Sequence, residues 1–141
     1  MTGAAFELLK SYLSDRKQYV KYNTIESNLK YIKTGVPQGS ILGPLLFSIY
    51  NNDLVITSNT IKFHMYADDT IVYFNLEEFS IDTLESDVTN ELNKISTWLR
   101  QNRLSLNTEK TKCMVFHAHQ KHIEPVTFSI NGELIEQVHY F

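Results

Sequence analysis

Apolar side chains recur at every third or fourth position in two stretches of the chain, residues 4–16 and residues 83–100. This spacing places them on one face of a helix, so it predicts two amphipathic helices. Asp82 and Glu85 predict a capping box at the start of the second helix. Residues 41–54 predict a third helix, and this helix should be buried because it carries too many apolar side chains for a surface helix. These side chains are Ile41, Leu42, Leu45, Leu46, Phe47, Ile49 and Tyr50. The polar positions of the second helix should lie on its surface: Asp87, Glu91, Asn93, Lys94 and Ser96.

Short runs rich in Val, Ile, Tyr and Phe alternate with turn residues and predict three β-hairpins. The paired runs are residues 18–23 and 28–33, residues 61–65 and 71–74, and residues 126–130 and 134–141. Asn131-Gly132, in the last pair, is the strongest short hairpin signal in the chain. Residues 113–116 predict a further, buried strand. Together these elements predict an α/β fold of the α+β kind, an antiparallel sheet with helices packed on one face.

The middle hairpin carries two adjacent carboxylates, Asp68 and Asp69, at its expected tip. Such a tip can hold two negative charges beside a divalent metal ion. Asp is also a favoured turn residue, because it tolerates the left-handed conformation and bonds its own backbone. The pattern alone therefore leaves two interpretations open, a metal site and a solvated turn.

A glycine-containing loop, residues 34–40, precedes the apolar helix. Pro37 favours an extended conformation at Val36, and Gly39 gives backbone freedom and room for another chain. Ser40 is a candidate N-cap. The loop could hold its free amides toward a ligand, or it could simply be a rigid start to the helix.

The length indicates one domain or part of one, residues 1–141, and we expect a soluble intracellular protein of the nucleus or the cytoplasm. The single cysteine, Cys113, excludes an internal disulfide, and no apolar run reaches the length of a membrane span. Three histidines near the C-terminal end match no metal-ligand spacing and are expected on a polar loop. They are His117, His119 and His122.

Charge is segregated along the chain, although the net charge is only −3. Residues 1–34 carry six basic and three acidic side chains, residues 53–91 carry one and nine, and residues 100–122 carry five and one. An acidic centre between basic segments suits a metal site beside a polyanion. The charges could equally be solvated, and the lysines of the first hairpin could either contact phosphates or protect an edge strand.

Three blocks occur in order along the chain: residues 34–47 (TGVPQGSILGPLLF), residues 66–70 (YADDT) and residues 106–112 (LNTEKTK). Together they closely resemble the reverse transcriptase domain of non-LTR retrotransposons of the jockey-like and long-interspersed-element kind. The resemblance extends to residues 11–20 and to the last hairpin, so it covers essentially the whole chain.

The resemblance implies an RNA-directed DNA polymerase whose palm holds two Mg²⁺ ions on aspartates. By motif position, Asp68 would be a direct metal ligand and Asp69 its less directly coordinated partner. Tyr66 and Ala67 would shape the floor under the primer end. The partners of the complete enzyme would be an RNA template, a DNA primer and a deoxynucleoside triphosphate, and the oligomeric state stays open.

The other matched positions would serve substrates as well. Gln38 and Gly39 would approach the template strand and the incoming nucleotide. Lys110 would be the general acid for the leaving pyrophosphate, and Lys112 competes for that role. Asn131-Gly132 and its flanking strands resemble the start of the primer-grip hairpin.

The chain also departs from the family pattern. A third carboxylate, from a strand expected upstream of residues 11–20, has no counterpart, since Glu7 lies in a helical context. We therefore expect a partial palm truncated at both ends, a ferredoxin-like core that lacks its first catalytic strand, with Met1 a gene-model start or the remnant of a decayed element. Such a chain should bind Mg²⁺ weakly and be inactive alone. The alternatives are a non-catalytic nucleic-acid-binding remnant and an inert pseudogene product.

Overall fold

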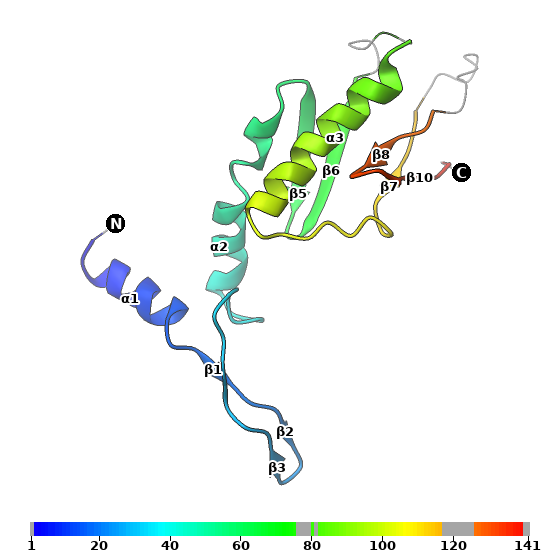
Figure 1. Ribbon diagram of the computed structural model, residues 1–141. Coiled ribbons are helices and arrows are strands. Elements are labelled where there is room, and N and C mark those ends of the chain that lie inside the picture. The colour runs from blue at the N-terminus through cyan, green and yellow to red at the C-terminus, as the bar shows by residue number, and fades with distance from the viewer. Residues whose placement is uncertain (1, 76–79, 81, 117–125, 140–141) are drawn as a thin grey trace. The chain divides into compact units, whose positions relative to one another are not determined.

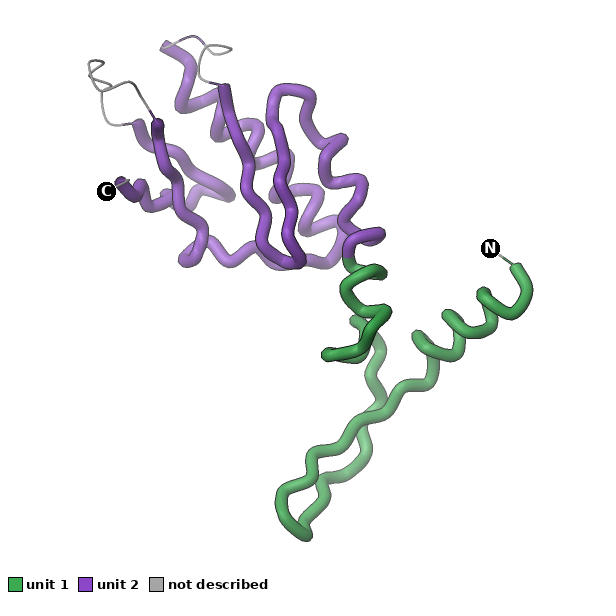
Figure 2. Tube along the Cα trace, turned by 180° about the vertical axis from the view of Figure 1, so that it is seen from behind, with its two compact units in different colours: residues 1–47 green, residues 48–141 purple. Residues whose placement is uncertain are grey.

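The computed structural model describes residues 2–75, 80, 82–116 and 126–139, and the chain divides into two compact units (Figure 2). Unit 1 is Met1–Phe47 and unit 2 is Ser48–Phe141. Helices and short strands occur in both units, as Figure 1 shows, which confirms the predicted α/β class. The described strands pair two by two, and four of the five pairs are antiparallel.

Unit 1 contains a short helix followed by a long hairpin. Helix α1 begins at the predicted residue but ends three residues earlier than expected, where Ser14 leaves the helical conformation. The elements of this unit are α1 (Ala4–Leu13), β1 (Lys17–Gln18), β2 (Lys21–Tyr22), β3 (Ile25–Glu26), β4 (Lys30–Tyr31) and the start of α2 (Leu42–Tyr50). Strand β1 pairs with β4, and β2 pairs with β3.

The hairpin of unit 1 contains a bulge between its two ladders. Two residues on the outgoing strand, Tyr19 and Val20, face three residues, 27–29, on the return strand. The Val20 N–H donates to Ser27 Oγ (2.9 Å), and the Ser27 N–H donates back to the Val20 carbonyl (2.9 Å). The extra residue is therefore accommodated without leaving these amides unpaired, and it increases the local twist.

Unit 2 is built around a long helix and the central hairpin. Its elements after α2 are η1 (Leu54–Thr57), β5 (Ile61–Tyr66), β6 (Asp69–Phe74), α3 (Leu84–Gln101), β7 (Lys112–Cys113), β8 (Ser129–Ile130), β9 (Glu133–Leu134) and β10 (Glu136–Gln137). Strands β5 and β6 pair antiparallel over six residues each, and α3 lies across one face of this hairpin (Figure 1). Strands β8 and β9 form the predicted Asn131-Gly132 hairpin, and β7 pairs with β10 in parallel.

The hydrophobic core lies between α3 and the hairpins of unit 2. The apolar stripe predicted for the helix is confirmed, because five of its members are buried and Leu99 packs against them. The buried cluster comprises Leu54, Ile61, Leu84, Val88, Leu92, Ile95, Trp98, Phe128, Ile130 and Ile135. Alternate residues of β5 and β6 pack against it, and the other residues of each strand are exposed.

A polar row on α3 lies against the edge of β8. The hydrogen bonds are Thr127 N–H to Glu85 Oε1 (2.5 Å), Ser129 N–H to Thr89 Oγ1 (3.4 Å), Asn131 N–H to Asn93 Oδ1 (2.9 Å) and Ser96 Oγ to Asn131 Oδ1 (2.7 Å). Four helical residues rise about 6 Å and two strand residues about 6.7 Å, so the two repeats match over this short distance. Helix side chains thus satisfy the amides of a strand edge.

Two surface predictions for α3 are wrong for this reason. Ser96 is buried and Asn93 is half-buried, because both face β8 rather than solvent. The predicted capping box is also wrong. Glu85 reaches Thr127, and the N-cap residue Thr83 makes no side-chain capping bond.

The helix expected to be buried is largely exposed. In α2 only Gly43 is buried, and the exposed fractions of Leu45 and Ile49 are 56% and 63%. The buried apolar cluster of the described residues begins at Leu54 and includes no residue of α2, so these side chains do not join the core. The strand predicted at residues 113–116 is likewise short, and Phe116 is 71% exposed.

Candidate active site

The central hairpin closes in a two-residue turn, Ala67-Asp68, between the paired residues Tyr66 and Asp69. The residue that takes the left-handed conformation is Ala67, with φ 52°, and not Asp68. A non-glycine residue in this region carries strain of about 1 kcal/mol or more and persists only where neighbours fix it. Here the six-residue ladder fixes both ends of the turn. The turn therefore presents Asp68 in one defined backbone geometry.

Both carboxylates are exposed at the end of a rigid element. Asp68 lies in the turn and Asp69 is the first residue of β6. Because β5 and β6 bury one face against the core, the residues of their other face remain open. The open face carries Lys62, His64, Tyr66, Asp69, Ile71 and Tyr73. The hairpin thus offers two acidic groups and a 79%-exposed tyrosine ring, that of Tyr66, on one side.

The donor set at the turn fits part of a magnesium site. Mg²⁺ prefers carboxylate oxygens and keeps several water ligands, so two exposed aspartates can supply protein ligands without burial. Across the part of the chain that the structure describes, no group of three or more His, Cys, Asp or Glu side chains could hold a metal ion. Asp68 and Asp69 therefore supply two carboxylates and have no third described acidic or histidine partner.

The loop at residues 34–40 is held by two side chains, one in the last turn of α1 and one that precedes β1. Arg16 donates hydrogen bonds to the carbonyls of Thr34 (3.1 Å) and Gly35 (2.5 Å). Tyr12 bonds Ser40 Oγ at 2.5 Å. The loop is thus fixed at both ends, and the exposed residues Gln38 and Gly39 lie between these contacts.

Ser40 confirms the predicted N-cap and does more than cap. Its hydroxyl donates to the Pro37 carbonyl (2.6 Å) and accepts from the Gly43 N–H (3.2 Å). Since its one proton is used on Pro37, Tyr12 must be the donor in their bond. Gly39 has φ 75°, and a Cβ there would meet nothing within 4 Å, so its backbone conformation is what requires glycine.

The two candidate lysines have different surroundings. The Lys112 ammonium is ion-paired with Glu136 across β7 and β10. No side-chain ion pair is found for Lys110 within the described residues, and its amide is held by Asn107 Oδ1 at 3.1 Å. In Figures 1 and 2 the segment that follows α3 runs along the same end of unit 2 as the β5–β6 turn.

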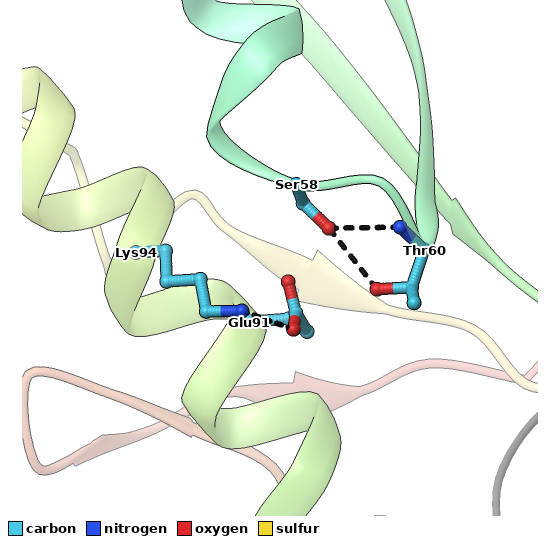
Figure 3. Close-up of polar contacts among 4 residues, drawn as sticks. All are labelled: Ser58, Thr60, Glu91 and Lys94. Carbon is cyan, nitrogen blue, oxygen red and sulfur yellow. Dashed lines mark hydrogen bonds and ion pairs between the residues drawn. The ribbon is translucent and has the colours of Figure 1, made fainter.

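One polar cluster was not expected from the sequence. The Glu91 side chain is 14% exposed, bonds Lys94 at 2.5 Å, and faces the hydroxyls of Ser58 and Thr60 (Figure 3). Burial raises the pKa of Glu91, but Lys94 and the two hydroxyls outweigh it, so this pKa lies below its ordinary value. The cluster joins α3 to the segment that enters β5, and it therefore helps to position the hairpin.

A hollow of about 220 Å³ lies at the other end of the hairpin. It is lined by Asn59, Thr60, Lys62, Tyr73, Phe74 and Asn75. These residues lie at the start of β5 and the end of β6, opposite the turn, so the hollow does not coincide with the carboxylates. The predicted polar loop with the three histidines lies outside the described residues. No helix among the described residues is long and apolar enough to cross a membrane.

Comparison with known proteins adds the family context. The chain matches the family described as reverse transcriptase (RNA-dependent DNA polymerase) over residues 2–133. It is 31% identical over 144 residues to the RNA-directed DNA polymerase from mobile element jockey of Drosophila funebris, covering 96% of this chain and 15% of that protein.

Two further relatives come from Drosophila melanogaster. The RNA-directed DNA polymerase from mobile element jockey is 30% identical, over 91% of this chain and 14% of its own length. The probable RNA-directed DNA polymerase from transposon BS is 29% identical, over 94% of this chain and 15% of its own length. The chain therefore spans about 15% of the length of these relatives. No solved structure matches the chain.

Proposed function

Because the chain belongs to the reverse transcriptase (RNA-dependent DNA polymerase) family, we propose that it supplies part of the palm active site of a non-LTR retrotransposon polymerase. The reaction is RNA-directed DNA synthesis by nucleotidyl transfer. The observation that carries this proposal is the placement of Asp68 and Asp69. They lie at the exposed end of a hairpin whose other face is packed against the core.

Asp68 acts as the direct metal ligand, and Asp69 as its less directly coordinated partner. Bound Mg²⁺, two ions in the complete domain, would activate the primer 3′-hydroxyl and neutralise charge on the phosphate and the leaving pyrophosphate. The turn geometry supports this role, because the strained Ala67 holds the Asp68 backbone in one conformation. Preorganised carboxylates need little rearrangement when the metal binds.

Neighbouring residues serve the substrates. Tyr66 and Ala67 support the primer end, with the exposed Tyr66 ring as the contact surface. Gln38 and Gly39 approach the template strand and the incoming nucleotide from the loop that Arg16 fixes. The substrates are an RNA template, a DNA primer and a deoxynucleoside triphosphate, and the site of action is the nucleus or the cytoplasm.

Lys110 is our choice for the general acid that protonates the leaving pyrophosphate. The ion pair between Lys112 and Glu136 supports this choice, because it occupies the competing ammonium group. An unpaired ammonium can approach an anionic leaving group without first breaking an ion pair. Lys112 then acts in folding, where it joins β7 to β10.

Two carboxylates neutralise less charge than a three-carboxylate site would. The 141-residue chain should therefore bind Mg²⁺ weakly and show no polymerisation by itself. Primer extension on an RNA template by the purified 141-residue protein would contradict this expectation.

A chimera tests the proposed function. Residues 2–133 replace the matching segment of the Drosophila melanogaster jockey polymerase, and primer extension is measured on an RNA template. We expect extension by the chimera, and a loss of about 10³-fold or more in the variants Asp68→Asn and Asp69→Asn. Asp53→Asn, an exposed acid before η1, is the matched control and should retain activity.

Two results would overturn the proposal. One is a chimera that is folded, as judged by binding of a primer–template duplex, yet extends no primer. The other is an Asp68→Asn chimera as active as the unsubstituted one. A Lys110→Ala variant slowed more than Lys112→Ala would support the assignment of the general acid, and the reverse order would exchange the two roles.

Non-catalytic nucleic-acid binding is the second candidate function. The exposed basic hairpin of unit 1 favours it, since this surface is separate in sequence from the two aspartates. RNA binding that falls with salt and survives both Asp→Asn substitutions, with no extension by the chimera, would support this candidate.

A further inference from the structure

The hairpin of unit 1, residues 16–33, is here named the arm. Every residue from 17 to 31 is exposed, so neither face of the arm is covered by the described part of the chain. Its large exposed side chains are Tyr19 (51%), Val20 (71%), Tyr22 (74%), Ile25 (72%), Leu29 (63%) and Tyr31 (67%). A two-stranded hairpin with no buried face is at best marginally stable in water. The uncovered apolar side chains of the arm therefore indicate a binding surface.

Charge identifies the chemistry of that partner. The arm carries five basic side chains, Arg16, Lys17, Lys21, Lys30 and Lys33, and its one acid is Glu26. Lys21 pairs with Glu26 at 2.7 Å, and Arg16 is used on the loop. Lys17, Lys30 and Lys33 have no carboxylate partner among the described residues. A polyanion would complement this surface.

The exposed aromatic side chains indicate which kind of polyanion fits the arm. Three tyrosine rings stand exposed among the lysines, and Lys17 Nζ lies 4.8 Å from the centroid of the Tyr31 ring. Basic residues interleaved with exposed aromatic rings suit single strands, whose unstacked bases can lie on the rings while phosphates meet the ammonium groups. A duplex keeps its bases stacked and would leave the rings unused.

We propose that the arm binds single-stranded nucleic acid, with Tyr19 and Tyr22 as stacking platforms and Lys17, Lys30 and Lys33 as phosphate contacts. The bulge at residues 27–29 adds twist between the two ladders, so successive rings and lysines can follow a curved strand. This inference extends the proposed function, because it assigns a template-class contact surface outside the active-site blocks.

The experiment measures binding of the full 141-residue chain to a fluorescent oligouridylate and a matched oligothymidylate by anisotropy, across a salt series. EDTA is present, so the result does not depend on the metal site. In the triple variant Lys17→Gln, Lys30→Gln, Lys33→Gln, the slope of log affinity against log salt should become shallower by about 2, because each phosphate contact to a single strand contributes about 0.7 to the slope. Preference for either oligonucleotide decides between RNA and DNA as the physiological strand.

Loss of a stacking contact should change binding differently from loss of a charge. Tyr22→Ala should weaken binding about 5- to 150-fold with the salt slope unchanged, because it removes stacking and no charge. Tyr22→Phe keeps the ring and should bind within about twofold of the unsubstituted chain. The side chain is exposed, so circular dichroism should show the same fold in all variants.

A matched control carries the same charge change elsewhere. The triple variant Lys10→Gln, Arg100→Gln, Arg103→Gln also loses three positive charges, and all three side chains are exposed. Its plot of log affinity against log salt should stay steeper than that of the triple lysine variant of the arm. Equal slopes in the two triple variants, or full affinity in Tyr22→Ala, would overturn the proposal. An equal loss of duplex and single-strand binding in the arm variants would also overturn the proposal.

The experiments distinguish failure of the inference about the arm from failure of the proposed polymerase function. A chimera that extends primers while arm variants bind single strands normally would overturn only the inference about the arm. Binding that depends on the arm, together with an inactive folded chimera, would overturn only the polymerase proposal.

Discussion

At the scale of single residues, Glu91 shows how a polar group can fix an element next to the site. Its carboxylate is mostly buried and meets Lys94, Ser58 and Thr60 (Figure 3). These contacts favour the ionised form more strongly than burial disfavours it. A carboxyl whose pKa is lowered by folding stabilises the folded state above its unfolded pKa. That contribution is lost as the pH falls through the folded pKa.

Glu91→Gln should therefore change the pH dependence of stability. The free energy of unfolding should fall by about 1 kcal/mol at pH 7, because a charge-assisted hydrogen bond is lost. The difference from the unsubstituted chain should shrink as the pH falls from the ordinary Glu value, 4.5, through the lower folded pKa. Urea unfolding at a series of pH values measures this difference in the free energy of unfolding.

Glu109→Gln is the control for this prediction, since Glu109 is exposed. It should leave the pH dependence unchanged within about 0.5 kcal/mol. A difference for Glu91→Gln that stays constant from pH 7 to acidic pH would contradict the lowered pKa.

At the scale of elements, α3 has two functional faces. The apolar face fills the core, and the polar row binds the edge of β8. The second face is what holds the Asn131-Gly132 hairpin beside the helix. A strand edge that would otherwise be open for pairing is thereby covered by side chains of the same unit.

Asn93→Ala should loosen this contact. It removes the acceptor for the Asn131 N–H, so we expect a loss of about 1 kcal/mol in the free energy of unfolding and faster hydrogen exchange at that amide. Asn90→Ala, at an exposed position of the same helix, is the control and should stay within about 0.5 kcal/mol. Equal effects from the two substitutions would contradict the role of the polar row.

At the scale of the whole molecule, exposed apolar area is the dominant feature. Large side chains such as Ile41 (95% exposed) and Ile56 (76% exposed) lie uncovered, and the described core contains ten buried apolar residues. A surface of this kind favours association with other surfaces.

The purified chain should self-associate with rising concentration. Ile41→Asp combined with Leu45→Asp should reduce that association, because it places two charges on the exposed apolar part of unit 1. Sedimentation velocity at several concentrations measures the change. Asn52→Asp adds charge at an exposed polar position and should have little effect. A monomeric unsubstituted chain would contradict this prediction.

Local patterns predicted much of the fold. The apolar stripe of α3, the hairpin around Asp68 and the Asn131-Gly132 turn all depend on neighbours within a few positions, so their residues alone define them. Motif order also identified the family, which residues 2–133 match. The burial expected for α2 was wrong because hydrophobic pattern reports what a helix could bury. It does not report how much partner surface exists.

The missed polar contacts had a similar cause. Glu91, Asn93 and Ser96 were assigned to the surface because the partners that bury them lie about 30 to 40 positions away in sequence. These partners are Ser58 and Thr60 for Glu91, and Asn131 for the other two. For the site, sequence located the candidate residues. Only the structure assigned the left-handed turn position to Ala67 and the ion pair to Lys112.

The polar row on α3 has a consequence for how this region can change during evolution. Its bonds depend on similar repeats, about 6 Å per four helical residues and about 6.7 Å per two strand residues. A single inserted or deleted residue between Glu85 and Ser96, or between Thr127 and Asn131, would shift every later donor away from its acceptor. Side chains here can be exchanged one at a time, but both segments must keep their length.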